Sequence, residues 1–556
     1  MKNKNNNSLK ESKVENKKEN KKENKYIDLK SVIVIGISLL FTFIVLATTQ
    51  AIMGKKVVTI TDNAAEQYYY DGRFDDAIKE YTSMQDKDVW PISTVEIANI
   101  CSLEGDITYS DSLLREAMVK RDKIMNENKD KYIEQDKELI NKVVFIFYIN
   151  NELDQAESLG EYYLGEYDTY KPLLKTMFAV YLAKGETEKA EELVKAYPVD
   201  NESAYDLAIL AKMQIILGNY NDGLENLKKS YDLDKNEVKS FDVIRETCEF
   251  NKSKLLQKVK ELSDENPNEK VYKVWLEEIN LIDGSNNNQE KDIISEINRN
   301  ITLKEVDKDS YVYKYVKAWD YYNKGDYEKA LECCNEAIKA NPENSESFGI
   351  LMPEILISMK EPTKVDGYIR TAVYNEPFNY NLISSIGKIY QNKIGDNEKA
   401  IGCFNLALLL NKDEDKLYYN LALANINIEN FDDAIEELKK AISINNNYKY
   451  YRALGTTYFN KGDYEDAIEN IRKAYSLNEK DVLSLNNAAC YYAMVEHDIW
   501  RAYSNIESAY KDMPSDLDES LKEVITTNYN LIKNLYDKYV NDESTPIIVD
   551  GLKLIY

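Results

Sequence analysis

A 34-residue repeat constrains this chain more than any other feature of its sequence. Two columns of small residues, seven positions apart, recur through residues 311–516. The first column is Ala330, Val365, Ala400, Ala434, Ala467 and Ala502, and the second is Ala337, Ala372, Ala407, Ala441, Ala474 and Ala509. A fixed period of this length is typical of an array in which each unit packs on its neighbours. The 556 residues are therefore expected to form an elongated repeat rather than one compact core.

One unit, residues 311–345, predicts a helical hairpin. Apolar and aromatic side chains recur at helical spacing before and after Gly325. Gly325 can adopt the left-handed conformation that ends a helix, and Asp326 can cap the helix that follows. The small residues of the two columns would let the paired helices approach closely. With only 19 Gly and 10 Pro in the chain, a turn-rich β-sandwich or barrel is not expected.

This spacing of small and aromatic residues resembles the tetratricopeptide repeat family. The resemblance is strong over residues 311–516, and it extends to 58–91 and 171–237. It implies an all-α fold, a right-handed superhelical solenoid of helix-turn-helix repeats that binds peptides or protein segments along its concave face. Pro353 stands where the family has a small residue in mid-helix, so we expect an irregular hairpin there.

The chain divides into segments of different character. Residues 92–170 keep the period loosely, with an insert at 126–137, and residues 238–310 keep helical patterning without the small columns. The C-terminal tail is expected to dock on the capping helix or to be offered to the sheet of a partner. The predicted segments are 1–30, a disordered Lys/Glu/Asn-rich cytoplasmic tail; 31–53, a transmembrane anchor; 58–237, N-terminal repeats; 238–310, degenerate helical repeats; 311–516, the regular array; 517–540, a capping helix; and 541–556, the C-terminal tail.

Residues 31–53 carry no charged side chain and are long enough, as a helix, to cross the ~30 Å hydrocarbon layer of a bilayer. A cleaved signal peptide is the competing interpretation, but its charged leader is short, whereas here thirty residues precede the apolar run. Seven Lys lie in residues 12–31, against Lys55, Lys56 and Arg73 in residues 54–73. The positive-inside rule then predicts a single-pass protein with a cytoplasmic N-terminus and an extracytoplasmic repeat domain, as in a bacterial signal-anchor protein.

Composition argues against several classes of function. Residues 57–556 carry a net charge of −33, which disfavours binding of nucleic acid. The single His rules out sites that need several imidazoles, and the six Cys follow no metal or redox spacing. Phosphate loops and hydrolase motifs are not found in the sequence. We therefore expect no enzyme activity, no cofactor, no metal and no small-molecule substrate.

The resemblance also suggests where a partner would bind. In the family, certain positions of the first helix line the concave surface, and Asn323, Asn427, Asn460 and Asn487 fall in such positions here. The candidate groove residues are Tyr315, Trp319, Tyr322, Tyr419, Arg452, Phe459 and Tyr491. Rigid aromatic side chains suit peptide recognition, although several of these could instead pack on neighbouring helices. Arg452 could pair with an acidic or carboxyl-terminal group of a ligand.

From these observations the chain is expected to be a non-enzymatic scaffold for protein–protein interaction, anchored in the bacterial cytoplasmic membrane, with a protein or peptide partner. The alternative is an extracytoplasmic sensor that closes on a peptide and signals across the membrane. The short N-terminal tail carries no recognisable output domain, which counts against the sensor.

Overall fold

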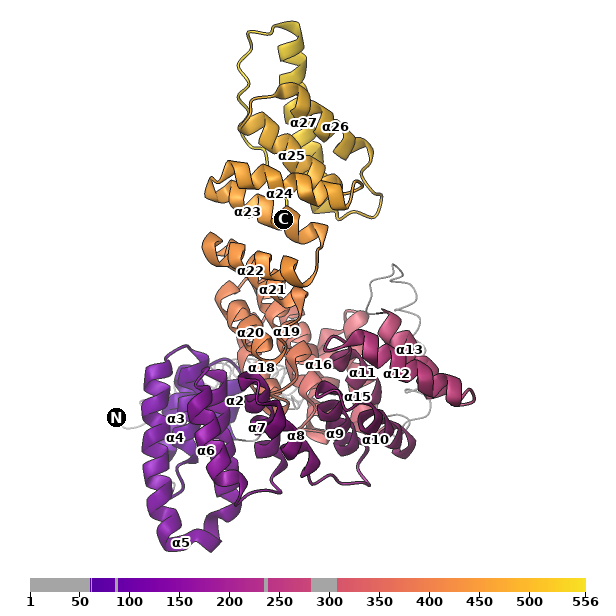
Figure 1. Ribbon diagram of the computed structural model, residues 1–556. Coiled ribbons are helices and arrows are strands. Elements are labelled where there is room, and N and C mark those ends of the chain that lie inside the picture. The colour runs from indigo at the N-terminus through magenta and orange to yellow at the C-terminus, as the bar shows by residue number, and fades with distance from the viewer. Residues whose placement is uncertain (1–60, 62, 86–88, 235–238, 282–307) are drawn as a thin grey trace, which may run out of the picture. The chain divides into compact units, whose positions relative to one another are not determined.

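The computed structural model describes residues 61, 63–85, 89–234, 239–281 and 308–556. Every regular element in these ranges is helical, which confirms the all-α prediction for this part of the chain. Consecutive helices pack in pairs to form a solenoid of helical hairpins (Figure 1). Among the described helices, none is both long and apolar enough to span a bilayer. The predicted tail, 1–30, and anchor, 31–53, lie outside the described residues.

The N-terminal half of the described chain is a series of helices. Their bounds are α2 (Ala64–Tyr70), α3 (Phe74–Gln85), α4 (Ile92–Leu103), α5 (Ile107–Ile149), α6 (Leu153–Leu164), α7 (Lys171–Lys184), α8 (Thr187–Lys195), α9 (Ala204–Ile216), α10 (Tyr220–Leu233), α11 (Lys239–Cys248), α12 (Lys252–Glu265) and α13 (Lys270–Leu281). Helices α9 to α13 share a core around the fully buried Trp275.

The C-terminal half begins at α15 and is more regular. Its elements are α15 (Tyr311–Asn323), α16 (Tyr327–Ala340), η1 (Ser347–Leu351), α17 (Met352–Ser358), η2 (Pro362–Lys364), α18 (Val365–Asn375), α19 (Tyr380–Ile389), η3 (Tyr390–Ile394), α20 (Asn397–Leu410), α21 (Asp415–Asn427), α22 (Phe431–Ile444), α23 (Tyr448–Lys461), α24 (Tyr464–Leu477), α25 (Val482–Met494), α26 (Ile499–Lys511) and α27 (Glu519–Asn541). Helix α27, in the segment predicted to cap the array, packs on α25 and α26.

The hairpin α23–α24 shows why the small residues repeat. Gly455 on α23 lies so close to α24 that an added Cβ would stand 2.8 Å from Cγ1 of Ile471 and 2.9 Å from the carbonyl oxygen of Ala467. Ala467 is itself fully buried. Helix α23 ends at Gly462, whose φ of 95° is a left-handed conformation that glycine adopts readily. The predicted register of the small columns is confirmed in this hairpin.

The irregular hairpin expected at Pro353 is present. The chain forms a π-helical turn at η1 and continues directly into α17, with Pro353 in the first turn of α17. A π-turn interrupts the regular hydrogen-bond ladder of a helix, so a proline that follows it need not break a regular bond. The π-turn thus lets the helix accommodate a proline that would break a regular helix interior.

The insert at 126–137 lengthens a helix instead of forming a loop. Helix α5 is 43 residues long and is interrupted at Asn128, where φ is −143° and ψ is 40°. Across this break Nε of Arg121 donates to Asp136 at 2.6 Å. Both side chains are buried. The extra residues therefore form two helical limbs that a buried ion pair joins.

The N-terminal helices also pack against α18–α20 of the C-terminal half, a contact that the repeat pattern does not predict. The hydroxyl of Tyr148 on α5 donates to the carbonyl oxygen of Pro377 at 3.0 Å. On α9, the buried ammonium of Lys212 lies 2.6 Å from carboxylate oxygens of both Glu246 and Glu376. Helices α2 and α7 contact α18 and α20. The N-terminal helices thus pack directly on the chain's own central helices.

Candidate peptide-binding groove

Residues 546–556 leave α27 and run back along the C-terminal hairpins without forming a helix or a strand. In Figure 1 the end of the chain lies beside α23. We call residues 552–556 the tail segment. It contacts helices α27, α25 and α23 through its own backbone. These three helices therefore form a groove that holds a length of polypeptide.

Asn528 on α27 binds the backbone of Lys553 with both ends of its carboxamide. The N–H of Lys553 donates to Oδ1 at 3.1 Å, and Nδ2 donates to the carbonyl oxygen of Lys553 at 2.8 Å. Nδ2 of Asn486 donates to the same carbonyl at 3.1 Å. A carboxamide offers the same donor and acceptor as a peptide group, so Asn528 bonds the segment as a neighbouring strand would.

Asn487 on α25 repeats this arrangement two residues further along the segment. The N–H of Ile555 donates to Oδ1 at 2.8 Å, and Nδ2 donates to the carbonyl oxygen of Ile555 at 2.6 Å. The hydroxyl of Thr456 on α23 donates to that carbonyl at 3.2 Å. A spacing of two residues is the period of extended chain. The two asparagines therefore fix an extended conformation through the backbone, whatever side chains the segment carries.

Arg452 closes the groove at the end of the tail segment. Its Nη1 lies 2.6 Å from Oδ2 of Asp481, and its Nη2 donates to the backbone oxygen of Tyr556 at 3.4 Å. Asp481 also caps α25 by accepting from the N–H of Ser484 at 3.2 Å. The sequence suggested that Arg452 could pair with an acid on a ligand. In the structure its charge is already paired with Asp481, and only one edge of the guanidinium faces the bound segment.

Side-chain contacts come from the apolar residues of the tail segment. Leu552 and Ile555 are buried and join a core cluster that includes Ile525 and Ile532 of α27. Tyr556 packs against a second cluster, built from α21–α24. Backbone bonds fix the path of the segment, while these pockets favour aliphatic side chains at positions 552 and 555.

Three of the seven predicted groove residues lie on the helices that form the groove, and a fourth, Tyr419, packs against the same cluster as Tyr556. Arg452 contacts the segment directly, and Phe459 and Tyr491 belong to the apolar cluster that contains Leu552 and Ile555. Tyr419 on α21 packs against Tyr450, with 5.0 Å between ring centroids. Phe459 and Tyr419 are half-buried, whereas Arg452 and Tyr491 are buried.

The other three, Tyr315, Trp319 and Tyr322, lie on α15. The hydroxyl of Tyr315 donates to Glu346 at 3.4 Å, and that of Tyr322 donates to Glu354 at 2.9 Å. Burial and the adjacent carboxylate raise the pKa of Tyr322 above its ordinary value. All three are half-buried within the array. Their participation in binding a partner stays a prediction.

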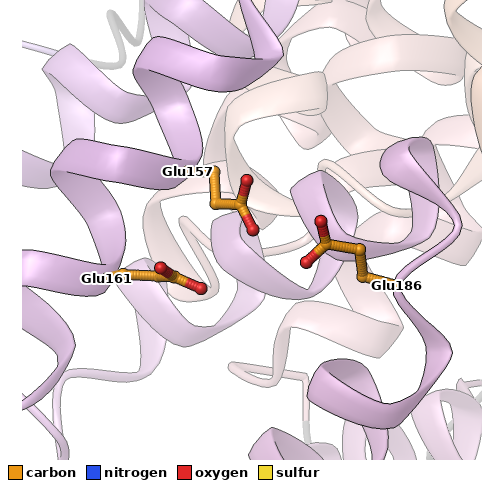
Figure 2. A group of neighbouring side chains, drawn as sticks. All are labelled: Glu157, Glu161 and Glu186. Carbon is orange, nitrogen blue, oxygen red and sulfur yellow. The ribbon is translucent and has the colours of Figure 1, made fainter.

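A group of three carboxylates lies elsewhere, on α6 and at the start of α8. Glu157, Glu161 and Glu186 point toward one another (Figure 2). Nζ of Lys189 lies 2.5, 2.8 and 2.7 Å from their oxygens, respectively. Burial alone would raise the pKa of Glu157, but the bonds from Lys184 and Lys189 lower it to about 2. The ammonium of Lys189 therefore supplies the positive charge that a metal ion would bring.

A polar cavity of about 260 Å³ lies between the N-terminal helices and α18. Its wall includes Glu96, Glu138, Lys142 and Arg370. Lys142 pairs with Glu96 and Glu138, and Arg370 donates to Ser102 at 3.2 Å. The charges of this wall are thus largely used within the fold, where they join the two halves of the chain.

Comparison with known proteins identifies the repeats. Family models described as tetratricopeptide repeat match residues 312–344, 415–448 and 448–481. The chain therefore contains tetratricopeptide repeats, and the last matched segment includes α23 with Thr456 and Arg452. A search of curated protein sequences gives no significant match.

The chain also matches solved structures, of which three follow. The Cut9–Hcn1 hetero-tetramer of APC/C is 12% identical, with 84% of this chain and 95% of that chain covered and a TM-score of 0.37. The human IFIT1 dimer with m7Gppp-AAAA is 15% identical, with 65% of this chain and 87% of that chain covered and a TM-score of 0.38. Pseudomonas aeruginosa pilF is 17% identical, with 40% of this chain and 96% of that chain covered and a TM-score of 0.30.

Proposed function

We propose that this protein is a non-enzymatic scaffold that binds extended segments of other proteins in the groove formed by α23, α25 and α27. The observation that carries this proposal is the tail segment, whose backbone is bonded at Lys553 by Asn528 and at Ile555 by Asn487. Main-chain bonds supply affinity, and pockets for side chains supply selectivity, as in other modes of peptide recognition. The tetratricopeptide repeats support a protein or peptide as the partner.

The proposal places the scaffold at the bacterial cytoplasmic membrane, with the repeats outside the cell. This part rests on the uncharged run 31–53 and on the excess of lysine before it. Protease added to cells stripped of their wall should digest the chain beyond Lys56 and leave residues before Lys30 protected. Protection of the repeats instead would contradict the proposed orientation.

Capture of partners tests the groove itself. The full chain, solubilised in detergent, serves as bait beside two variants. Asn487→Ala removes two bonds to the bound backbone, whereas Asn505→Ala on α26 removes only a bond to the carbonyl oxygen of Arg501, one turn earlier. Proteins that bind in the groove should be lost with Asn487→Ala and retained with Asn505→Ala. Capture that is equal with both variants would place binding on another surface.

The identity of the captured material separates the scaffold from its alternative. Several envelope proteins would support the scaffold. A single short secreted peptide would favour a sensor that signals across the membrane.

A further inference from the structure

The groove that would receive a partner is filled by the chain's own residues 552–556. The donors and acceptors of Asn487 and Asn528 that face the groove are all used by Lys553 and Ile555. An external segment cannot make these bonds until the tail segment leaves. We propose that the tail segment is a built-in competitor, and that the external ligand is an extended peptide that replaces it residue for residue. This inference rests on the proposed function and concerns the same site.

The contacts define the chemistry of such a ligand. Its backbone must offer an N–H and a C=O at two positions separated by one residue, because these are the groups that the two asparagines bond. A proline at either position would remove the required N–H. The positions of Leu552 and Ile555 are buried among apolar side chains, whereas Lys553 is exposed. The ligand should therefore carry aliphatic residues at its first and fourth positions and tolerate a charged residue at the second.

The connection between α27 and the tail segment allows release without unfolding of the repeats. Residues 542–551 are non-helical and half-buried or exposed, and Ile548 is 71% exposed. Gly551, with φ of 84°, lies just before the tail segment. As a tethered ligand the segment acts at an effective concentration on the order of millimolar. A partner must therefore bind more tightly than the tail segment, or the tail segment must be detached first.

Cys490 on α25 reports whether the groove is covered. Its Sγ lies 3.6 Å from the carbonyl oxygen of Lys553, and the side chain is fully buried. Burial raises the pKa of this thiol to about 12, which suppresses the reactive thiolate. Departure of the tail segment should expose the thiol and restore its reactivity.

The first experiment follows maleimide labelling of Cys490 in the full chain by mass spectrometry. Lys553→Pro removes the N–H that Asn528 accepts, and Lys553→Ala keeps it as the matched control. We expect Cys490 to label at least tenfold faster in Lys553→Pro than in the wild type or in Lys553→Ala. Equal rates in the three proteins would overturn the proposal.

A second pair of variants controls for misfolding of Lys553→Pro. Ile555→Asp should release the tail segment in the same way, whereas Ile548→Asp, on the exposed part of the connection, should not. Cys334 is fully buried on α16 and should stay unlabelled in every variant. Labelling of Cys334 together with Cys490 would indicate that the array has unfolded in that release variant. The other release variant, in which Cys334 stays unlabelled, then provides the test.

The second experiment restores the ligand as a separate molecule. The peptide Val-Asp-Gly-Leu-Lys-Leu-Ile-Tyr, which has the sequence of residues 549–556, should protect Cys490 in Lys553→Pro. The same peptide, N-methylated at the residues equivalent to Lys553 and Ile555, should fail to protect it. Equal protection by the two peptides, or by neither, would refute binding through the backbone. A wild-type dimer in light scattering that becomes monomeric in Lys553→Pro would show that the tail segment is exchanged between two copies, contrary to the proposal.

The capture assay keeps this inference separate from the proposed function. If both hold, Lys553→Pro should capture more partner than the wild type. If Cys490 responds as expected but neither protein captures a partner, the scaffold function fails. If partners are captured through Asn487 while Cys490 does not respond, the scaffold stands and the built-in competitor is refuted.

Discussion

At the scale of single residues, Ala467 marks the closest contact between α23 and α24. It is fully buried, and the neighbouring Glu469 is exposed. Ala467→Leu should lower the free energy of unfolding by about 1 to 3 kcal/mol, because the contact has room only for a methyl group. Glu469→Leu on the same helix should change it little. Urea unfolding followed by circular dichroism measures both, and equal midpoints would contradict the register.

Glu414 gives the array a predictable response to pH. This carboxyl, 6% exposed at the start of α21, has its pKa raised to about 7 by burial and by Glu249, against the opposing effect of Lys416. Since the unfolded pKa is about 4.3, the folded state binds more protons between these values, and stability falls as pH rises from about 4.5 to 7.

Replacing Glu414 by Gln should remove this dependence. The variant should match the wild type near pH 4.5 and be more stable above pH 7 by about 1 to 3 kcal/mol. Urea titrations at pH 4.5, 6 and 8 measure the difference. A variant that is less stable than the wild type at pH 8 would show that the ionised carboxylate stabilises the fold.

Single residues also show what the sequence could reveal about the site. Asn487 falls in a position that the family resemblance assigns to the concave surface. It is one of the two asparagines that bond the backbone of the tail segment. The repeat pattern does not single out Asn528, because this residue lies in the segment 517–540 that the sequence predicts to be a cap, although a buried amide between Ile525 and Ile532 is the available signal of a specific bond. Its partner, Lys553, lies in a tail whose path depends on tertiary contacts alone.

At the scale of the element, two glycines in helices should respond to the same substitution with opposite signs. Gly402 on α20 has open space where a Cβ would stand, so Gly402→Ala should stabilise by about 0.5 to 1 kcal/mol. Gly455→Ala should destabilise by about 1 to 3 kcal/mol, since its Cβ would meet Ile471 and the backbone of α24. Thermal unfolding of both variants tests this, and a shift of the same sign would contradict the close approach of α23 and α24.

The individual elements were largely predictable. The hairpin turns, the small columns and the irregularity at Pro353 follow from local chemistry, so the sequence pattern contains them. Helix α5 was not predicted, because its continuation depends on the buried bond between Arg121 and Asp136 across the break. The spacing of apolar residues in the sequence does not predict such a contact.

At the scale of the whole molecule, a buried ion triad joins the N-terminal half to the central helices. Lys212 lies between Glu246 and Glu376, and all three side chains are buried. Lys212→Met should destabilise the fold by about 3 to 5 kcal/mol, because two carboxylates would stay buried without their cation. The exposed pair of Lys229 with Glu225 provides the control, since Lys229→Met should have little effect.

The measurement is urea unfolding followed separately in each half of the chain. If the triad couples the halves, Lys212→Met should separate a single transition into two. Unchanged midpoints in both halves would contradict that role. This long-range contact could not be predicted, because a 34-residue period describes only how each hairpin packs on the next.

Hydrogen exchange of the tail segment tests the central claim most directly, that the groove binds extended chain through its backbone. The N–H groups of Lys553 and Ile555 donate to Asn528 and Asn487, so we predict that these two amides exchange at least tenfold more slowly than those of Leu552 and Leu554. The alternation should disappear in Lys553→Pro, where Ile555 should exchange as in a free peptide. Uniformly fast exchange of residues 552–556 in the wild type would contradict the account.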